Sequence, residues 1–158
     1  MNNPEISIRL SKPGDLWEIQ RMLVETISTI CKNDYSPEQI EVWTSSVKNT
    51  QRWTGKLTSQ YFLVAELDNK IVGVASLENN SYLDFLYVHK DYQRQGIADR
   101  LYFEIEREAI KRKATSIRSD VSKTARPFFE KKGFITTETQ TIKILEVEIV
   151  NYKMTKTI

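Results

Sequence analysis

The stretch most suited to binding a ligand is Gln93-Arg94-Gln95-Gly96-Ile97-Ala98. It lies between an apolar run that ends at Val88 and a helical apolar pattern, so a strand should lead through a loop into a helix N-terminus. Gly96 and Ala98 are small enough to let a ligand approach the backbone. The first N–H groups of a helix lack intrahelical partners and lie at the positive end of the helix dipole. The segment therefore predicts a site for a phosphate or pyrophosphate group.

The spacing of this loop excludes two common nucleotide-binding motifs. No Lys-Ser/Thr pair follows a glycine loop, so the chain has no P-loop. No glycine stands two residues before Gly96, so the dinucleotide fingerprint is absent as well. One glycine alone would favour an ordinary tight turn at a helix start. The whole strand–loop–helix segment favours a binding site instead.

The first half of the chain reads as a strand, two helices and three strands. A strand is expected over Ile6–Leu10 and a helix over about Asp15–Cys31, from apolar residues at strand and helix spacing. Ser36 and Gln39 form a capping box, with Pro37 at the first helical position, and so start a second helix. The strands are expected at 61–67, 71–77 and 82–88, with turns at 68–70 and 78–80.

The second half reads as helix, strand, short helix and two strands. The long helix should begin near Gly96 and carry its apolar residues on one face. A strand follows at 116–121, then a short helix that Gly133 ends in the left-handed conformation. The final strands are expected at about 134–141 and 146–155, and the turn between them has no Gly or Pro.

This element order predicts the fold class. The late strand–helix–strand unit implies a parallel strand pair with a right-handed crossover, and the hairpins imply antiparallel strands. We therefore expect an α/β (α+β) fold with a mixed, mostly antiparallel sheet and helices on both faces.

Two blocks of the sequence resemble the GNAT family of N-acetyltransferases. The loop Gln93–Ala98 resembles the family's motif A, Q/R-x-x-G-x-G/A. Ala125-Arg126-Pro127-Phe128-Phe129-Glu130-Lys131-Lys132-Gly133-Phe134 resembles the family's A-x-x-F-Y-E-K-x-G-F. The expected element order also matches the GNAT fold along nearly the whole chain, including a splayed central pair of parallel strands.

The resemblance implies that acetyl-CoA binds as a co-substrate. Its pyrophosphate would contact backbone N–H groups from Arg94 to Asp99, and its pantetheine arm would pair with the backbone of Leu86 and Val88. The N–H of Leu86 would bind the thioester oxygen and stabilise the tetrahedral intermediate. The complete expected cofactor set is Leu86, Tyr87, Val88, Gln93, Arg94, Gln95, Gly96, Ile97, Ala98, Asp99, Ser122 and Phe129.

The second block departs from the family pattern. Many GNAT proteins have a Tyr where this chain has Phe129, and that Tyr protonates the leaving thiolate. The motif therefore assigns no general acid here. A thiol with a pKa of about 8.5 is still a tolerable leaving group. Ser122 stands where family members often have Asn, and it can still form a hydrogen bond.

The acceptor side offers fewer signals. A primary amine is mostly protonated at neutral pH, so a base must remove its proton. Asp84 and Tyr82 are the candidates, because strand alternation should place them on one face with Leu86. An ordinary polar residue is an equally good reading of Asp84. Tyr35 and Trp43 are the candidates for the wall of the acceptor pocket, although core packing is the stronger reading for Trp43. Arg52 and Trp53 are further candidates for closing that pocket.

Other candidate residues have simpler explanations. His89 should be an exposed turn residue, and Cys31 should be a bystander thiol because no partner base is evident.

Composition limits the remaining function classes. A length of 158 residues suits one domain, 1–158, and a net charge of +2 argues for neither nucleic-acid nor membrane binding. One Cys and one His form neither a disulfide nor a metal cluster. The chain shows no signal-peptide pattern and no apolar run of the roughly 20 residues that span a bilayer. We therefore expect a cytoplasmic protein without a metal, as a monomer or homodimer.

Two functions remain open. The first is an N-acetyltransferase that transfers acetyl directly from acetyl-CoA to a primary amine of a small molecule or peptide. The alternative is a non-catalytic acyl-CoA-binding module that acts as a sensor or interaction domain. Phe129 favours the second, whereas Asp84 and the intact loop favour the first.

Overall fold

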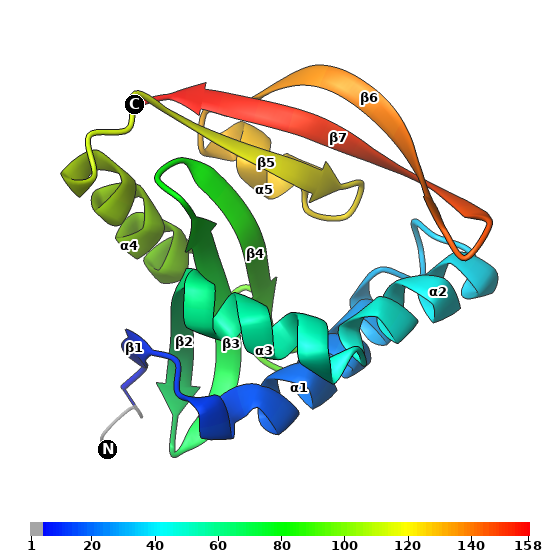
Figure 1. The fold of residues 1–158 in the computed structure, drawn as a ribbon, viewed down its shortest axis with the longest axis horizontal. Helices are drawn as coiled ribbons and strands as arrows, with labels where there is room; N and C mark the ends of the chain where they lie inside the picture. The colour runs from blue at the N-terminus through cyan, green and yellow to red at the C-terminus, as the bar shows by residue number, and fades with distance from the viewer. Residues whose placement is uncertain (1–4) are drawn as a thin grey trace.

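The computed structural model describes residues 5–158 as a seven-stranded sheet with helices on both faces (Figure 1). The sheet order is β1-β2-β3-β4-β5-β7-β6, and all neighbouring strands are antiparallel except β4 and β5. The strands are β1 (Ser7–Leu10), β2 (Tyr61–Leu67), β3 (Lys70–Glu78), β4 (Tyr82–Val88), β5 (Ser116–Ser122), β6 (Ile135–Ile144) and β7 (Val147–Thr157). The helices are η1 (Pro13–Asp15, a 3-10 turn), α1 (Leu16–Ile30), α2 (Pro37–Val47), α3 (Thr50–Ser59), α4 (Ile97–Lys111) and α5 (Arg126–Lys131). The expected fold class is confirmed.

Three helices cover one face of the sheet. The apolar stripe of α1 is fully buried at Ile19, Leu23 and Ile27. The capping box that starts α2 is present, with the Gln39 N–H donating to Ser36 Oγ at 3.1 Å. Helix α3 was not predicted, because its sequence TQRWTGKLTS is mostly polar and buries only Trp53. Its start could have been read from Asn49, whose side chain accepts the Arg52 N–H at 3.1 Å.

Helices α4 and α5 cover the other face. Leu101, Ile105 and Ala109 of α4 are fully buried in a core cluster with β2, β3 and β4. Gly73 of β3 lies directly beneath α4, where a Cβ atom would come within 3.0 Å of side-chain carbons of Ile97 and Leu101. As predicted, Gly133 ends α5 with a φ of 95°.

The terminal hairpin is longer than expected. Strand β6 continues to Ile144 and β7 begins at Val147, so only Leu145 and Glu146 form the turn. Both adopt left-handed backbone, with φ of 47° and 68°. This conformation is typical of tight hairpin turns but is usually supplied by Asn or Gly, which is why the sequence did not indicate it.

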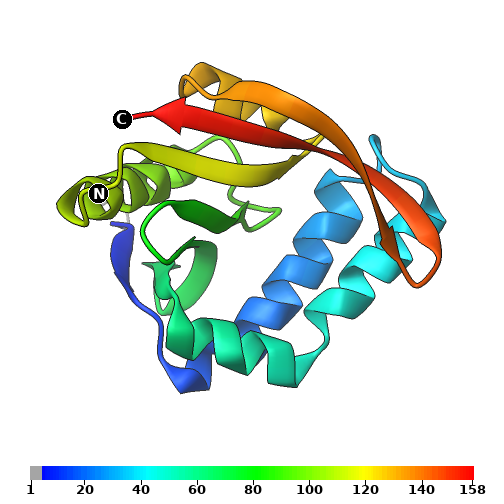
Figure 2. The same ribbon diagram turned by 45° about the horizontal axis from the view of Figure 1, so that its top comes forward.

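The sheet opens between its two parallel strands. Strands β4 and β5 pair at one register position, Tyr82 opposite Arg118, and then diverge. Strands β5, β6 and β7 consequently form a half-sheet that lifts away from β1–β4 (Figure 1, Figure 2). Within residues 5–158, no helix is both long and apolar enough to cross a bilayer.

Candidate functional site

A bulge in β4 shapes the opening between the strands. Leu83 pairs with Leu77 and Phe85 pairs with Ser76, so Asp84 is an extra residue. The side chains of Leu83 and Leu86 pack toward α4, whereas Phe85 packs toward α1–α3. The prediction that Asp84 shares a face with Leu86 is therefore wrong. The extra residue breaks strand alternation and turns Asp84 toward α3.

The bulge also decides which backbone groups face the opening. The His89 N–H donates to the carbonyl of Val72 on β3 at 2.8 Å. Backbone groups of successive strand residues point to opposite sides, so those of Leu86 and Val88 point toward β5. The Val88 carbonyl is already bonded to Gln93 Nε2 at 2.6 Å. The Leu86 N–H and carbonyl and the Val88 N–H therefore line the opening.

The loop after β4 folds around His89. Its ring is buried and accepts the Asp91 N–H at Nδ1, at 3.0 Å. The ring also packs edge-on against Tyr92, with 5.2 Å between centroids. Burial, followed by the nearby Lys70 ammonium, lowers the pKa of His89. The prediction of an exposed histidine is thus wrong, because this side chain organises the loop from within.

The loop ends in a concave run of N–H groups at the start of α4. Arg94 and Gly96 have φ of 60° and 80°, so left-handed residues interrupt the turn, an arrangement typical of anion-binding backbone. Gly96 is the N-cap of α4, and a Cβ atom there would meet nothing within 4 Å. Arg94, Gln95 and Gly96 are exposed, whereas Asp99 forms an ion pair with Lys132. The loop thus presents an open site with free N–H groups to an anion.

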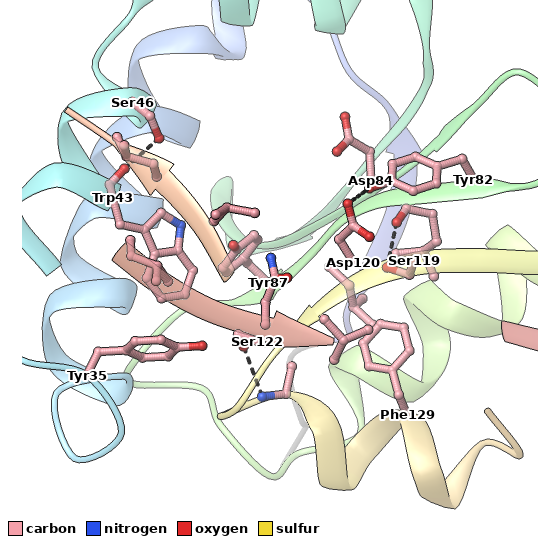
Figure 3. Close-up of a pocket in the computed structure, with 18 of the residues that line it drawn as sticks. Tyr35, Trp43, Ser46, Tyr82, Asp84, Tyr87, Ser119, Asp120, Ser122 and Phe129 are labelled. Carbon is pink, nitrogen blue, oxygen red and sulfur yellow. Dashed lines mark hydrogen bonds between the residues drawn. The ribbon is translucent and has the colours of Figure 1, made fainter. Parts of the chain in front are cut away.

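On the other side of β4 the opening leads into a cavity of about 280 Å³ (Figure 3). Residues from the α1–α2 loop, α2, α3, β4, β5, α5, β6 and β7 line it. Its aromatic end includes Tyr35, Trp43 and Tyr87, and its acidic end includes Tyr82, Asp84 and Asp120 (Figure 3). Ser122 and Phe129 lie along the side from which β5 leads into α5 (Figure 3). Ile142, Ile144 and Ile149 contribute an apolar surface.

At the acidic end, Asp84 is held by two side chains of α3. Lys56 Nζ and Gln60 Nε2 both donate to Asp84 Oδ2, at 2.8 and 2.7 Å. The Asp84 and Lys56 side chains are 14% and 20% exposed, so this ion pair is mostly shielded from water. Because both donors converge on Oδ2, the other oxygen, Oδ1, remains available to the cavity.

Tyr82 bonds across the opening to β5. Its hydroxyl donates to Asp120 Oδ2 at 3.0 Å. Burial, and then the charge of Asp120, raise the pKa of Tyr82. A phenol that holds its proton this strongly and already donates it is a poor base, which leaves Asp84 as the stronger of the two predicted candidates.

The aromatic end of the cavity offers ring surface to a ligand and no available acid or base. The rings of Tyr35 and Trp43 meet edge to face, with 5.3 Å between centroids. The Tyr35 hydroxyl donates to the Val150 carbonyl and accepts the Lys123 N–H, both at 2.9 Å. Burial raises the pKa of Tyr35 to about 12. Its hydroxyl is fully engaged, so Tyr35 offers only its ring to a ligand.

Polar side chains also stand where β5 ends. Ser122 Oγ accepts the Ala125 N–H at 3.1 Å, which leaves its own proton to donate. Asn151 pairs with Ser122 across β5 and β7, and its buried Oδ1 has no hydrogen-bond partner among the described residues. Phe129 is buried and packs edge-on against Phe134 at 5.0 Å while also lining the cavity.

Comparison with known proteins identifies the family to which this fold and site belong. A family model described as "Acetyltransferase (GNAT) domain" matches residues 31–156. The chain belongs to the GNAT family of acetyltransferases. It is 30% identical over 154 residues to the uncharacterized N-acetyltransferase YafP of Escherichia coli K12, covering 98% of this chain and 96% of that protein.

Solved GNAT structures share the same architecture. A GCN5-related N-acetyltransferase from Rhodopseudomonas palustris superposes with a TM-score of 0.94 at 32% identity, covering 100% of this chain and 98% of that one. The PaiA N-acetyltransferase from Thermoplasma acidophilum, solved in complex with coenzyme A, superposes with a TM-score of 0.83. It is 22% identical and covers 98% of this chain and 99% of that one.

In this GNAT protein the predicted residues gather around one opening. The strand residues Leu86–Val88 lead along the opening toward the loop 93–99, and Asp84, Tyr82, Tyr35 and Trp43 lie around the cavity. Trp43 is half-buried, so it both packs and lines the cavity. Trp53, a further candidate, is 1% exposed and belongs to the core instead.

Sequence reasoning missed Lys56, Gln60, Asp120 and Asn151. The first two depend on α3, whose start Asn49 signalled. Asp120 alternates along β5 with buried residues, which indicates a polar face but not its partner Tyr82.

Within residues 5–158 no group of three or more His, Cys, Asp or Glu side chains could hold a metal ion.

Proposed function

We propose that this GNAT acetyltransferase transfers the acetyl group of acetyl-CoA directly to the primary amine of a small molecule. The observation that carries the proposal is the opening between β4 and β5, which has a loop suited to an anion on one side and a cavity on the other. A cavity of about 280 Å³ matches a small acceptor better than a folded protein surface.

The donor side fits coenzyme A. The Leu86 carbonyl and the Val88 N–H line the opening and can bond the amides of a pantetheine arm, as a neighbouring strand would. The N–H groups from Arg94 to Asp99 can bind a pyrophosphate, and Gly96 leaves the backbone open to it. The coenzyme A complex of the Thermoplasma relative supports the same use of this fold.

On the acceptor side, Asp84 Oδ1 binds the incoming ammonium and takes its proton directly or through water. The amine nitrogen then forms a bond to the thioester carbon. The Leu86 N–H stabilises the oxyanion, an effect worth about 10²–10³ in rate in other acyl-transfer enzymes. The C–S bond breaks as the thiolate leaves, and Ser122 can donate a hydrogen bond toward it. The second proton on the amine nitrogen passes to solvent or to the departing thiolate.

A non-catalytic acyl-CoA-binding module remains the second candidate, favoured by Phe129. This residue has no proton to give, and it packs within a cluster of aromatic side chains. The same donor site would then bind the coenzyme without turnover.

Thiol release separates the two functions. We expect acetyl-CoA to protect the protein against thermal unfolding, by about 2.7 kcal/mol at 100 times its dissociation constant. We also expect free CoA thiol to appear when a panel of primary amines is added. Protection without thiol release from any amine would favour the binding module, and a flat thermal shift at millimolar CoA would contradict both functions.

A further inference from the structure

One side of α3 carries a residue that lines the cavity and two that bond a cavity residue. Arg52, Lys56 and Gln60 follow one another at intervals of four residues, with Gln60 as the C-cap of the helix. Residues at this spacing lie on one side of a helix. Lys56 and Gln60 both bond Asp84, so this side of α3 faces the acidic end of the cavity. Arg52, one turn earlier, lines the cavity.

Arg52 is the only cation among the described residues that line the cavity, and its side chain is exposed at the edge of that cavity. Of the cavity's two carboxylates, Asp84 pairs with Lys56 through Oδ2 and keeps Oδ1 for a ligand, and Asp120 accepts a bond from Tyr82. Among the described residues, no carboxylate lies within ion-pair distance of the Arg52 guanidinium. A cavity with a carboxylate at one end and an unpaired guanidinium beside it is complementary to a molecule that carries both charges.

The phosphates of coenzyme A do not supply the missing anion. The loop around Gly96 starts α4, which packs on one face of the sheet. Helix α3 packs through Trp53 on the opposite face. The Arg52 side chain therefore belongs to the acceptor side of the opening.

We propose that the acceptor is an amine whose far end carries an anionic oxygen group, and that Arg52 binds that group. The inference rests on acetyl transfer to a small amine as the function. Four helical residues rise by about 6 Å, so the anion and the ammonium at Asp84 lie several ångströms apart. Trp43, Tyr35 and Tyr87 provide flat apolar surface for the part of the molecule between the two charges.

Three benzylamines of nearly the same shape test this assignment. 4-(Aminomethyl)benzoate carries a carboxylate opposite its amine, 4-(aminomethyl)phenylphosphonate carries a phosphonate there, and 4-methylbenzylamine carries an uncharged methyl group. We expect wild-type protein to prefer an anionic probe over the methyl probe in kcat/KM by about 10- to 100-fold, the range for a hydrogen bond to a charged group. The ratio between the two anionic probes identifies carboxylate or phosphonate as the better group.

The variant Arg52→Met should abolish this preference, so that its kcat/KM values for the anionic and methyl probes agree within about twofold. Arg52→Lys should keep part of it, because the charge remains but the two-pronged donor geometry is lost. Lys48→Met is the matched control: it removes an exposed cation from the neighbouring C-cap of α2, outside the cavity lining, and should leave the preference intact. A preference that survives Arg52→Met, or a wild type that prefers the methyl probe, would overturn the assignment of Arg52.

Thermal shifts with the same probes keep the two proposals distinguishable. Stabilisation by an anionic probe that Arg52→Met removes, without thiol release from any amine, would support the anion site and refute the enzyme function. Turnover of all three probes at equal efficiency would leave the enzyme function standing and refute the anion site. Absence of both binding and turnover with every probe would refute the anion site.

Discussion

The left-handed backbone at Gly96 allows the coenzyme loop to be tested with two matched substitutions. A side chain in this conformation costs about 1–2 kcal/mol whatever its length. A Cβ atom at Gly96 meets no other atom within 4 Å, so the Cβ of Ala or Glu adds no steric clash. Gly96→Ala and Gly96→Glu should therefore destabilise the fold equally, with a fall in Tm of about 2–4 °C for each kcal/mol in a chain of this size.

The two variants should differ in their affinity for coenzyme A. A carboxylate about 5 Å from a phosphate charge costs about 3 kcal/mol at an effective dielectric constant of 20. Gly96→Glu should therefore bind CoA about 10²-fold more weakly than Gly96→Ala in isothermal titration calorimetry. The difference should shrink as salt screens the exposed charges. Equal affinities of the two variants at low salt would refute the placement of a pyrophosphate at this loop.

The remaining predictions concern the catalytic side and the loop. Asp84→Asn should slow thiol release by about 10²-fold at neutral pH, with partial recovery at higher pH as more amine loses its proton unaided; an unchanged pH–rate profile would remove Asp84 from the mechanism. Phe129→Tyr should retain activity if its hydroxyl reaches the cavity, whereas a large fall in Tm would show that the phenol is buried without a partner. His89 has a lowered pKa in the fold, so the stability it contributes is present above its unfolded pKa of about 6.5 and is lost as pH falls through the folded pKa. CoA affinity should decline over the same acidic range, and His89→Asn should show no such decline, since its amide oxygen can still accept the Asp91 N–H.

Local signals predicted the strand, loop and helix from Tyr82 to Lys111 well. The apolar run before the loop, the small residue Gly96 and the helical periodicity after it together indicated a strand, a loop and a helix N-terminus, and the structure confirms all three. These features are encoded within a few neighbouring residues. The resemblance of two separate blocks to GNAT proteins then supported the whole element order.

The acceptor side could not be predicted in the same way. The partner of Asp84 comes from a helix 28 residues earlier in the chain, and that helix has little apolar pattern. The bulge at Asp84 is equally hidden, because strand alternation over Tyr82, Asp84 and Leu86 looks regular in the sequence. The ring of His89 was misplaced for a related reason: a polar residue in a turn is usually exposed, but here Tyr92 and the loop fold over it.

The single pairing of β4 with β5 has a consequence for the behaviour of the protein without coenzyme. Beyond that one pair, each strand has backbone N–H and C=O groups without a partner strand, as an edge strand of a sheet does. A pantetheine arm that accepts a hydrogen bond from the Val88 N–H would fill the opening between the two half-sheets, so hydrogen exchange at that amide should slow when CoA binds. Without the coenzyme, the same backbone groups are a template for an extended peptide, which would add to β4 as a foreign strand.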